Sequence, residues 1–171
     1  GFMKLCWDIE SDGLNHTLVW CLAVIDVDSG EEYFFTDHDS RYPSMSEGVA
    51  LLQKASVHIG HNLVGFDIPA LNKYYGFEVG SNQKVVDTML LSQLNDFYRP
   101  SLNKASKIGG RGTHAMKTWG IALGDHKHDD PDWNEYSPEM MERCVSDVVI
   151  NIKIYKYLIH LSLKNIQGGS Q

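Results

Sequence analysis

The chain has 171 residues, a hydrophobic content of 43% and a formal net charge of -7, which predicts a single domain, spanning residues 1–171, with a buried core. The acidic balance argues against a protein that coats nucleic acid, and no apolar run approaches the roughly 18 residues that cross a membrane. No secretory leader pattern opens the chain, and Cys6, Cys21 and Cys144 form no CxxC pair, so we expect reduced thiols in a cytoplasmic protein.

The first third of the chain predicts three β-strands, at residues 4–10, 18–27 and 31–36. These segments are rich in Val, Ile, Trp, Tyr and Phe, which favour strands, and Asp28-Ser29-Gly30 supplies a turn between the last two. Because the three strands follow one another along the chain, we expect an antiparallel meander.

The middle of the chain predicts further helices and strands. A helix is expected over residues 46–55, a short strand over 57–60, a second strand over 84–87 and a helix over 88–94. Between the two strands, a helix should begin at Asp67, because Asp is a favourable N-cap and Pro69 is tolerated in a first turn. Gly76 can close its far end.

The last part of the chain predicts a loop and a long helix. Residues 96–112 hold one proline and three glycines with little periodicity, which indicates a flexible loop, and a short helix over 113–119 follows. Ser137-Pro138 is typical of a helix start. The apolar stripe of this C-terminal helix is expected to consist of Met141, Val145, Val148, Ile152, Tyr155 and Ile159.

Two carboxylates, Asp8 and Glu10, lie two residues apart inside the first predicted strand. Side chains alternate between the faces of a strand, so Leu5, Trp7 and Ile9 share one face and the two acids share the other, roughly 6–7 Å apart. Like charges at a half-buried position raise each other's pKa, whereas a shared Mg²⁺ or Mn²⁺ would remove the repulsion. The alternative is the solvated outer face of an edge strand.

Three further polar residues stand in apolar settings. Asn62 and Asp67 occupy a strand-to-helix junction, a place where open sheets commonly bind ligands, although Asp67 alone is also explained as a helix cap. Asp147 lies beside the predicted apolar stripe of the last helix, so it is either a boundary residue or a ligand. Together with Asp8 and Glu10, these carboxylates favour one common site over four separate structural roles.

These residues resemble the motifs of a known family. Asp8-Ile9-Glu10, the segment from Asn62 to Asp67, and Asp147 are similar to the three motifs of DEDD 3'-5' exonucleases. The flanking segments 61–71, 86–92, 113–124 and 139–149 are similar to the proofreading domain of family A DNA polymerases, especially those of short-tailed phages. The resemblance implies an α/β fold of the RNase H type, in which helices flank a mixed central sheet.

The resemblance also implies a two-metal reaction, with two Mg²⁺ or Mn²⁺ ions about 4 Å apart as cofactors. Asp8 would bridge both ions, Glu10 and Asp147 would complete the site that holds the attacking water, and Asp67 would act on the second ion. The reaction would remove nucleoside monophosphates from the 3' end of single-stranded DNA, in replication proofreading or phage DNA metabolism. RNA is the alternative substrate, and a polymerase domain or subunit is an expected partner.

Substrate contacts are expected from several segments. Asn62 would position the terminal nucleotide, and Phe66 and Leu14 would stack on or wedge the terminal bases unless they belong to the core. Residues 96–117 include five basic residues and a single acid. This balance fits phosphate contacts along a single strand of nucleic acid or, alternatively, a solvated loop. The five are Arg99, Lys104, Lys107, Arg111 and Lys117.

The chain departs from the family pattern in its last motif. Relatives carry a Tyr four residues before the final Asp, or a His five before it, to orient the attacking water. Those positions here hold Arg143 and Glu142. A guanidinium cannot act as a base at neutral pH, so Arg143 is expected to hold the scissile phosphate. Glu142, if the helix phase differs, or Tyr136 from the preceding loop would then orient the water.

Two alternative functions follow from the same sequence. The first is a catalytically weak, exonuclease-like module that binds DNA ends or a polymerase partner, which the loss of the Tyr would permit. The second is another RNase H-like enzyme, such as an endonuclease or integrase, which the segment from Asn62 to Asp67 argues against. His126 and His128 suggest a zinc site only weakly, because no further ligands stand at zinc-finger spacing.

Overall fold

The protein is known from a computed structural model that describes residues 1–13, 17–94 and 132–169. The loop predicted at 96–112, the helix predicted at 113–119 and the histidine pair of residues 126–128 lie outside these ranges. Within the described residues, no helix combines the length and apolar character that spanning a membrane would need.

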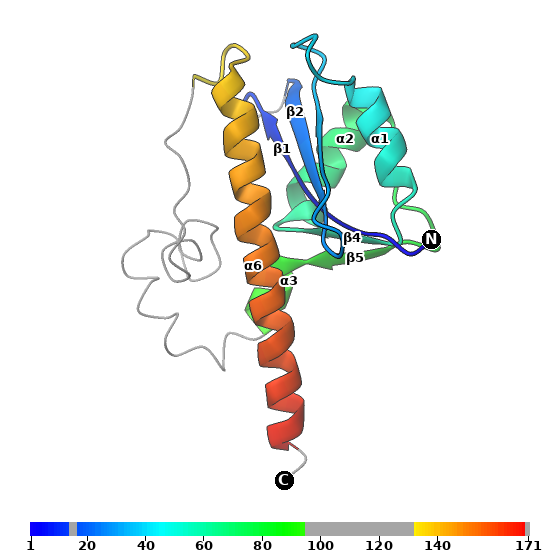
Figure 1. The fold of residues 1–171 in the computed structure, drawn as a ribbon, viewed down its shortest axis with the longest axis vertical. Helices are drawn as coiled ribbons and strands as arrows, with labels where there is room; N and C mark the ends of the chain where they lie inside the picture. The colour runs from blue at the N-terminus through cyan, green and yellow to red at the C-terminus, as the bar shows by residue number, and fades with distance from the viewer. Residues whose placement is uncertain (14–16, 95–131, 170–171) are drawn as a thin grey trace.

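A five-stranded mixed sheet forms the centre of the domain (Figure 1). The strands are β1 Lys4–Ser11, β2 Val19–Asp26, β3 Glu32–Phe35, β4 Val57–Gly60 and β5 Lys84–Asp87. β1 to β3 pair as the predicted antiparallel meander, while β4 and β5 continue the sheet parallel to β1, giving the order β3-β2-β1-β4-β5. All five predicted strands and the mixed sheet are confirmed.

The predicted helices of the described ranges are also present. They are α1 Met45–Gln53, α2 Ile68–Tyr75, α3 Thr88–Leu94 and α6 Pro138–Gly169. Ser44 starts α1 in a capping box with Glu47. Gly76 ends α2 with a positive φ of 66°, the left-handed conformation that glycine adopts readily. One element was not predicted: a short π-helix, η1 Leu63–Asp67, runs directly into α2.

Helices cover both faces of the sheet and divide the core in two (Figure 1). On one face, α1 and α2 bury a cluster that includes Leu5, Trp7 and Ile9 of β1. On the other face, α6 packs across β2, β1 and β4 and buries a cluster that includes all three cysteines, which are free thiols. The sheet therefore separates an α1/α2 side from an α6 side, and β1 contributes alternate residues to each.

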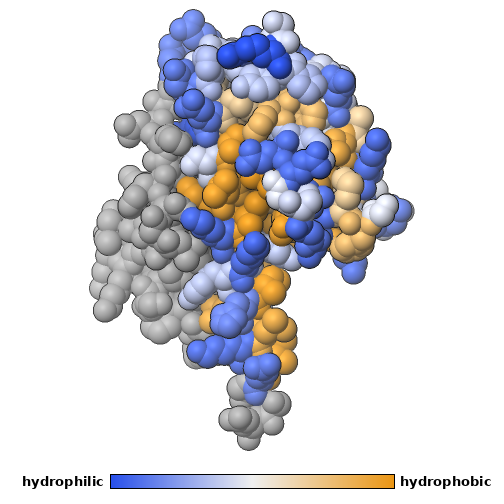
Figure 2. Space-filling model, viewed as in Figure 1, coloured by the Kyte–Doolittle hydropathy of each residue, from blue (hydrophilic) through white to orange (hydrophobic). Residues whose placement is uncertain are grey.

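The buried stripe of α6 differs from the predicted one. Ile159 is 38% exposed, whereas the fully buried line runs through Met140, Cys144, Val148, Ile154 and Leu158. The buried line turns toward α3, because Ile154 and Leu158 pack in a cluster with Leu91 of that helix. The C-terminal part of α6 projects beyond the sheet and shows apolar surface there (Figures 1 and 2). Leu163 and Ile166 are exposed.

Candidate active site

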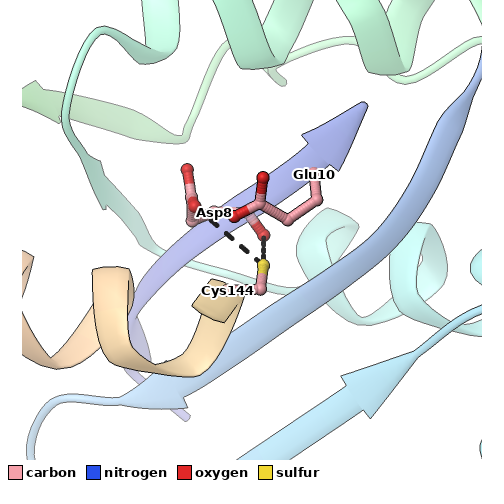
Figure 3. A group of neighbouring side chains, drawn as sticks. All are labelled: Asp8, Glu10 and Cys144. Carbon is pink, nitrogen blue, oxygen red and sulfur yellow. Dashed lines mark hydrogen bonds between the residues drawn. The ribbon is translucent and has the colours of Figure 1, made fainter. Parts of the chain in front are cut away.

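Asp8 and Glu10 lie on the α6 side of β1 (Figure 3). β1 is the third of five strands, with β2 on one side and β4 on the other, so the interpretation as an edge strand is wrong. Glu10 is only 6% exposed, and Asp8 is half-buried. The alternation of a central strand thus holds both carboxylates under α6, on the side opposite Trp7.

The turn after β4 brings Asp67 to the same place. Asp87, at the end of β5, fixes this turn by accepting hydrogen bonds from the backbone N–H groups of Asn62 (2.8 Å) and Val64 (3.1 Å). Asn62 has a left-handed φ of 61°, and a Cβ on Gly65 would come within 2.5 Å of the Asn62 Oδ1. A larger residue at position 65 would therefore displace the Asn62 side chain, and η1 runs through this turn to Asp67.

Asp67 is not the helix cap that its position suggested. Its side chain makes no capping hydrogen bond to the described first turn of α2, because η1 continues into α2 and the Ile68 N–H already donates to the Leu63 carbonyl. The carboxyl group is instead 3% exposed and accepts a hydrogen bond from the Ile9 backbone, beside Asp8. The π-helical turn thus directs the carboxylate at β1.

All four predicted carboxylates line one pocket of about 200 Å³. Asp147 reaches it from α6 and is 5% exposed. The other side chains of the pocket are Ile9, His61, Asn62, Phe66, Arg143 and Asn151. Three segments far apart in the sequence therefore meet at one acidic cavity, and Asn62 and Phe66 lie in it as expected. Leu14, Lys104, Lys107 and Arg111 lie outside the described residues.

The carboxylates of the pocket repel one another. Burial, followed by the charges of Asp8 and Asp147, raises the pKa of Glu10 from 4.5 to about 10, and the nearby Arg143 only partly opposes this. Burial and the charge of Asp8 also raise the pKa of Asp67 well above its usual value. Glu10 Oε1 and Asp67 Oδ2 are buried and accept no hydrogen bond from the described residues. A divalent cation with oxygen ligands fits these atoms.

Arg143 is the one Arg or Lys side chain of the described pocket. It is 8% exposed, and its Nε lies 3.7 Å from Glu10 Oε1. Its guanidinium carbon lies 5.4 Å from the ring centre of Trp133, within the range of a cation–π contact. The guanidinium is therefore held between an aromatic ring and a carboxylate, at the wall of the acidic cavity.

The two proposed substitutes for the family Tyr do not reach the pocket. Glu142 is exposed on α6. The Tyr136 hydroxyl donates to Asp39 (3.5 Å), and its ring stacks on His38. Since neither residue lines the pocket within the described residues, both expectations are wrong.

Three residues near the acids were missed in the sequence. His61 Nδ1 lies 2.9 Å from the Thr88 hydroxyl, which in turn lies 2.7 Å from Asn151 Oδ1. Cys144 Sγ lies 3.1 Å from the Asp8 carbonyl oxygen. Asn151 and Cys144 stand one turn after and one turn before Asp147, so helical spacing could have indicated both.

Comparisons with known proteins identify the family of the chain. A family model described as RNase_H superfamily matches residues 5–109. The chain is 25% identical to the DNA-directed DNA polymerases of Enterobacteria phage T3 and Escherichia phage T7, over 89% of its own length. It spans only 26%, about a quarter, of those polymerases. The predicted resemblance to phage polymerases is confirmed.

Solved structures show the same fold. A structure titled "apo form of the nuclease" matches with a TM-score of 0.66 and 20% identity, covering 95% of this chain and 74% of that one. Brucella melitensis NrnC matches with a TM-score of 0.64 and 18% identity, and the match covers 96% of this chain and 75% of that one. The family B DNA polymerase of Pyrobaculum calidifontis matches with a TM-score of 0.54 and 18% identity, and the match covers 93% of this chain and 25% of that one. The RNase H-like fold predicted from the sequence is confirmed.

Proposed function

The chain belongs to the RNase H superfamily, and from this premise we propose that it is a metal-dependent 3'-5' exonuclease acting on single-stranded DNA. One observation carries the proposal. Four carboxylates from β1, η1 and α6 line a single pocket, and two of their buried oxygens accept no hydrogen bond from the described residues. In this proposal residues 1–171 form one exonuclease domain.

The chain's own residues would hold two Mg²⁺ or Mn²⁺ ions. Asp8 would contact both, Glu10 and Asp147 would complete one ion's ligand set, and Asp67 would serve the other. When bound, such ions lower the pKa of the attacking water and stabilise the charge on the leaving 3' oxygen. The carboxylates supply the negative charge that makes the pocket selective for divalent cations.

Substrate positioning would fall to the polar and aromatic walls of the pocket. Arg143 presents a buried guanidinium that can donate to the oxygens of the scissile phosphate. Asn62 and Phe66 lie where they can hold the sugar and base of the terminal nucleotide. Phosphates further along the strand would contact the basic strip at 99–117, through Lys104, Lys107 and Arg111, and Leu14 would wedge the terminal bases.

The proposed setting is DNA replication. The relatives from phages T3 and T7 are DNA polymerases, which supports a role in proofreading or phage DNA metabolism in the cytoplasm of an infected cell. A polymerase domain or subunit is the proposed partner.

The test is digestion of 5'-labelled single strands of DNA and RNA of equal sequence, with Mg²⁺, Mn²⁺ or EDTA. We expect a ladder of products that shortens from the 3' end of DNA and does not form in EDTA. In Asp8→Asn the rate of hydrolysis should fall by roughly a thousandfold, since bound metal ions stabilise the transition state by several kcal/mol. Glu78→Gln, which removes an exposed acid outside the pocket, should leave the rate unchanged.

Several results would contradict the proposal. Internal cuts would indicate an endonuclease. A ladder that persists in EDTA would show that hydrolysis does not depend on metal ions, and faster digestion of RNA would show that RNA is the preferred substrate. One observation favours a second candidate function, a weakly catalytic module that binds DNA ends: Arg143, rather than a hydroxyl group, stands beside Glu10. Tight binding of the strand without any ladder would support that function.

A further inference from the structure

Cys144 brings a thiol to the edge of the acidic cavity (Figure 3). Its Sγ lies 3.1 Å from the Asp8 carbonyl oxygen and 4.0 Å from Asp8 Oδ2. A sulfur or oxygen atom from each of Asp8, Glu10 and Cys144 lies within 4.8 Å of the other two. Two hard carboxylate ligands and one soft sulfur ligand are therefore close enough to share an ion.

The fold fixes this thiol firmly. Cys144 is fully buried and lies one turn before Asp147 on α6, on the stripe that packs against the sheet. It also hydrogen-bonds to Cys21 of β2, which pairs with Glu10 across the strands. Because both β1 and β2 hold the side chain, the sulfur keeps its place beside the acids.

We propose that Cys144, together with Asp8 and Glu10 of the pocket wall, binds a thiophilic divalent cation, Zn²⁺ or Cd²⁺. Zinc accepts sulfur and oxygen together in a four-coordinate site, whereas Mg²⁺ takes oxygen ligands and leaves the thiol unused. The thiol proton passes to solvent as the thiolate binds the ion.

The geometry supports a shared ion. Zinc bonds of about 2.3 Å to sulfur and 2.0 Å to oxygen place the two ligand atoms roughly 3.5 Å apart in a tetrahedral site. The observed 4.0 Å between Cys144 Sγ and Asp8 Oδ2 requires a movement of only about 0.5 Å. Glu10 Oε1 is buried and makes no hydrogen bond within the described residues, although Arg143 Nε lies 3.7 Å from it.

The consequence for activity rests on the proposed function. An ion held by Cys144, Asp8 and Glu10 would occupy two of the carboxylates that the Mg²⁺-dependent reaction needs. We therefore expect Zn²⁺ and Cd²⁺ to inhibit hydrolysis in the presence of excess Mg²⁺.

The binding test needs no activity. Cd²⁺ is titrated into the metal-free protein, and the ultraviolet charge-transfer band of a cadmium–thiolate bond is recorded. The band should appear at one equivalent and vanish in Cys144→Ser, while Cys6→Ser, which removes another buried thiol of the same cluster, should keep it. A band that persists in Cys144→Ser would overturn the assignment.

X-ray absorption of the Cd²⁺ complex of the unmutated protein identifies the metal's ligand atoms without relying on variants that could misfold. One sulfur neighbour is expected, and a shell of oxygen and nitrogen only would contradict the proposal whatever the variants do.

The activity test then separates this inference from the proposed function. Relative to each protein's own rate in Mg²⁺, Cys144→Ser should need about tenfold more Cd²⁺ for half-inhibition, as expected when a metal loses a supporting group. Hydrolysis in Mg²⁺ without a cadmium–thiolate band would overturn the inference alone. A band without any hydrolysis in Mg²⁺ would overturn the proposed function alone.

Discussion

The two faces of β1 show how one strand serves stability and chemistry separately. On the α1/α2 side, Leu5, Trp7 and Ile9 are almost completely buried in an apolar cluster. On the α6 side stand Asp8 and Glu10, each one residue after an apolar neighbour, Trp7 or Ile9. Adjacent residues of the same strand thus occupy environments with opposite requirements, because the strand period is two.

Both faces bury polar atoms that make no hydrogen bond within the described residues, but His58 Nε2 on the α1/α2 side belongs to an imidazole ring, whereas those on the α6 side belong to carboxylates. The Trp7 indole N–H donates to His58 Nδ1 at 3.0 Å, and the ring packs edge-on against Phe77. Across the strand, Glu10 Oε1 and Asp67 Oδ2 accept no hydrogen bond from the described part of the chain. A buried polar group without a partner costs roughly 1–3 kcal/mol. On β1, the apolar side chains of the α1/α2 side stabilise the fold, whereas the buried carboxylates of the α6 side oppose it.

The largest expected effect tests this contrast with neighbouring substitutions. Leu5→Ala removes a fully buried side chain and should lower the free energy of unfolding by about 2–5 kcal/mol. Asp8→Ala, three residues along, should leave the metal-free protein at least as stable as the parent, because it relieves repulsion with Glu10 and Asp67. Urea denaturation in EDTA measures both.

Loss of several kcal/mol on Asp8→Ala in EDTA would show that this carboxylate is a structural element. The functional assignment of the face would then fail, even if activity were also lost.

The second prediction concerns pH. Because the folded protein raises the pKa of Glu10 from 4.5 to about 10, the unfolded chain releases this proton first as pH rises. The stability of the metal-free protein should therefore be highest below pH 4.5, as far as Glu10 contributes, and fall as the pH rises toward 10. Glu10→Gln should flatten this decline and stabilise the metal-free protein at pH 8 relative to the parent.

Thermal melting between pH 5 and 9, with and without Mn²⁺, provides the measurement. Glu78→Gln is the matched control, since it removes an exposed carboxylate, and it should retain the parent slope. A Glu10→Gln protein with the same slope as the parent would mean that Glu10 is ionised in the metal-free fold.

Local sequence patterns were sufficient for most of the fold. Thr88–Leu94 and Val57–Gly60 follow directly from capping, turn and hydrophobic signals, which depend on near neighbours. The joint placement of Asp8 and Glu10 also followed, because it needs only the alternation of a strand. Residues linked by helical or strand spacing were therefore predictable from the sequence.

Tertiary features were not predictable in the same way. The side chain of Asp67 turns toward β1 because η1 replaces an ordinary cap, and no local signal distinguishes that turn from the N-cap of α2. Ile159 fits the apolar period of α6, yet it is exposed because the buried line of the helix turns toward Leu91 of α3 through Ile154 and Leu158. Tyr136 pairs with Asp39, almost a hundred residues away. Each outcome depends on a partner distant in the sequence.

The smallest expected effect concerns Arg143, which lies on the α6 face but carries the opposite charge. A Tyr at this position would offer a hydroxyl to orient the attacking water, whereas Arg offers only donors and positive charge. We therefore expect a slow exonuclease that favours Mn²⁺, in which Arg143→Tyr raises the single-turnover rate at saturating strand by about tenfold, or about 1.4 kcal/mol.

Arg143→Ala separates the two roles of this position. It should weaken binding of the strand, because the guanidinium beside Glu10 is lost as a phosphate donor, without the gain in rate that Tyr brings. The comparison is made at saturation because Arg143→Tyr also gives up that phosphate contact. If Arg143→Tyr were slower than the parent at saturation, the guanidinium itself would promote hydrolysis. The α6 face would then have replaced the water-orienting hydroxyl with a cation that stabilises the transition state, rather than lost it.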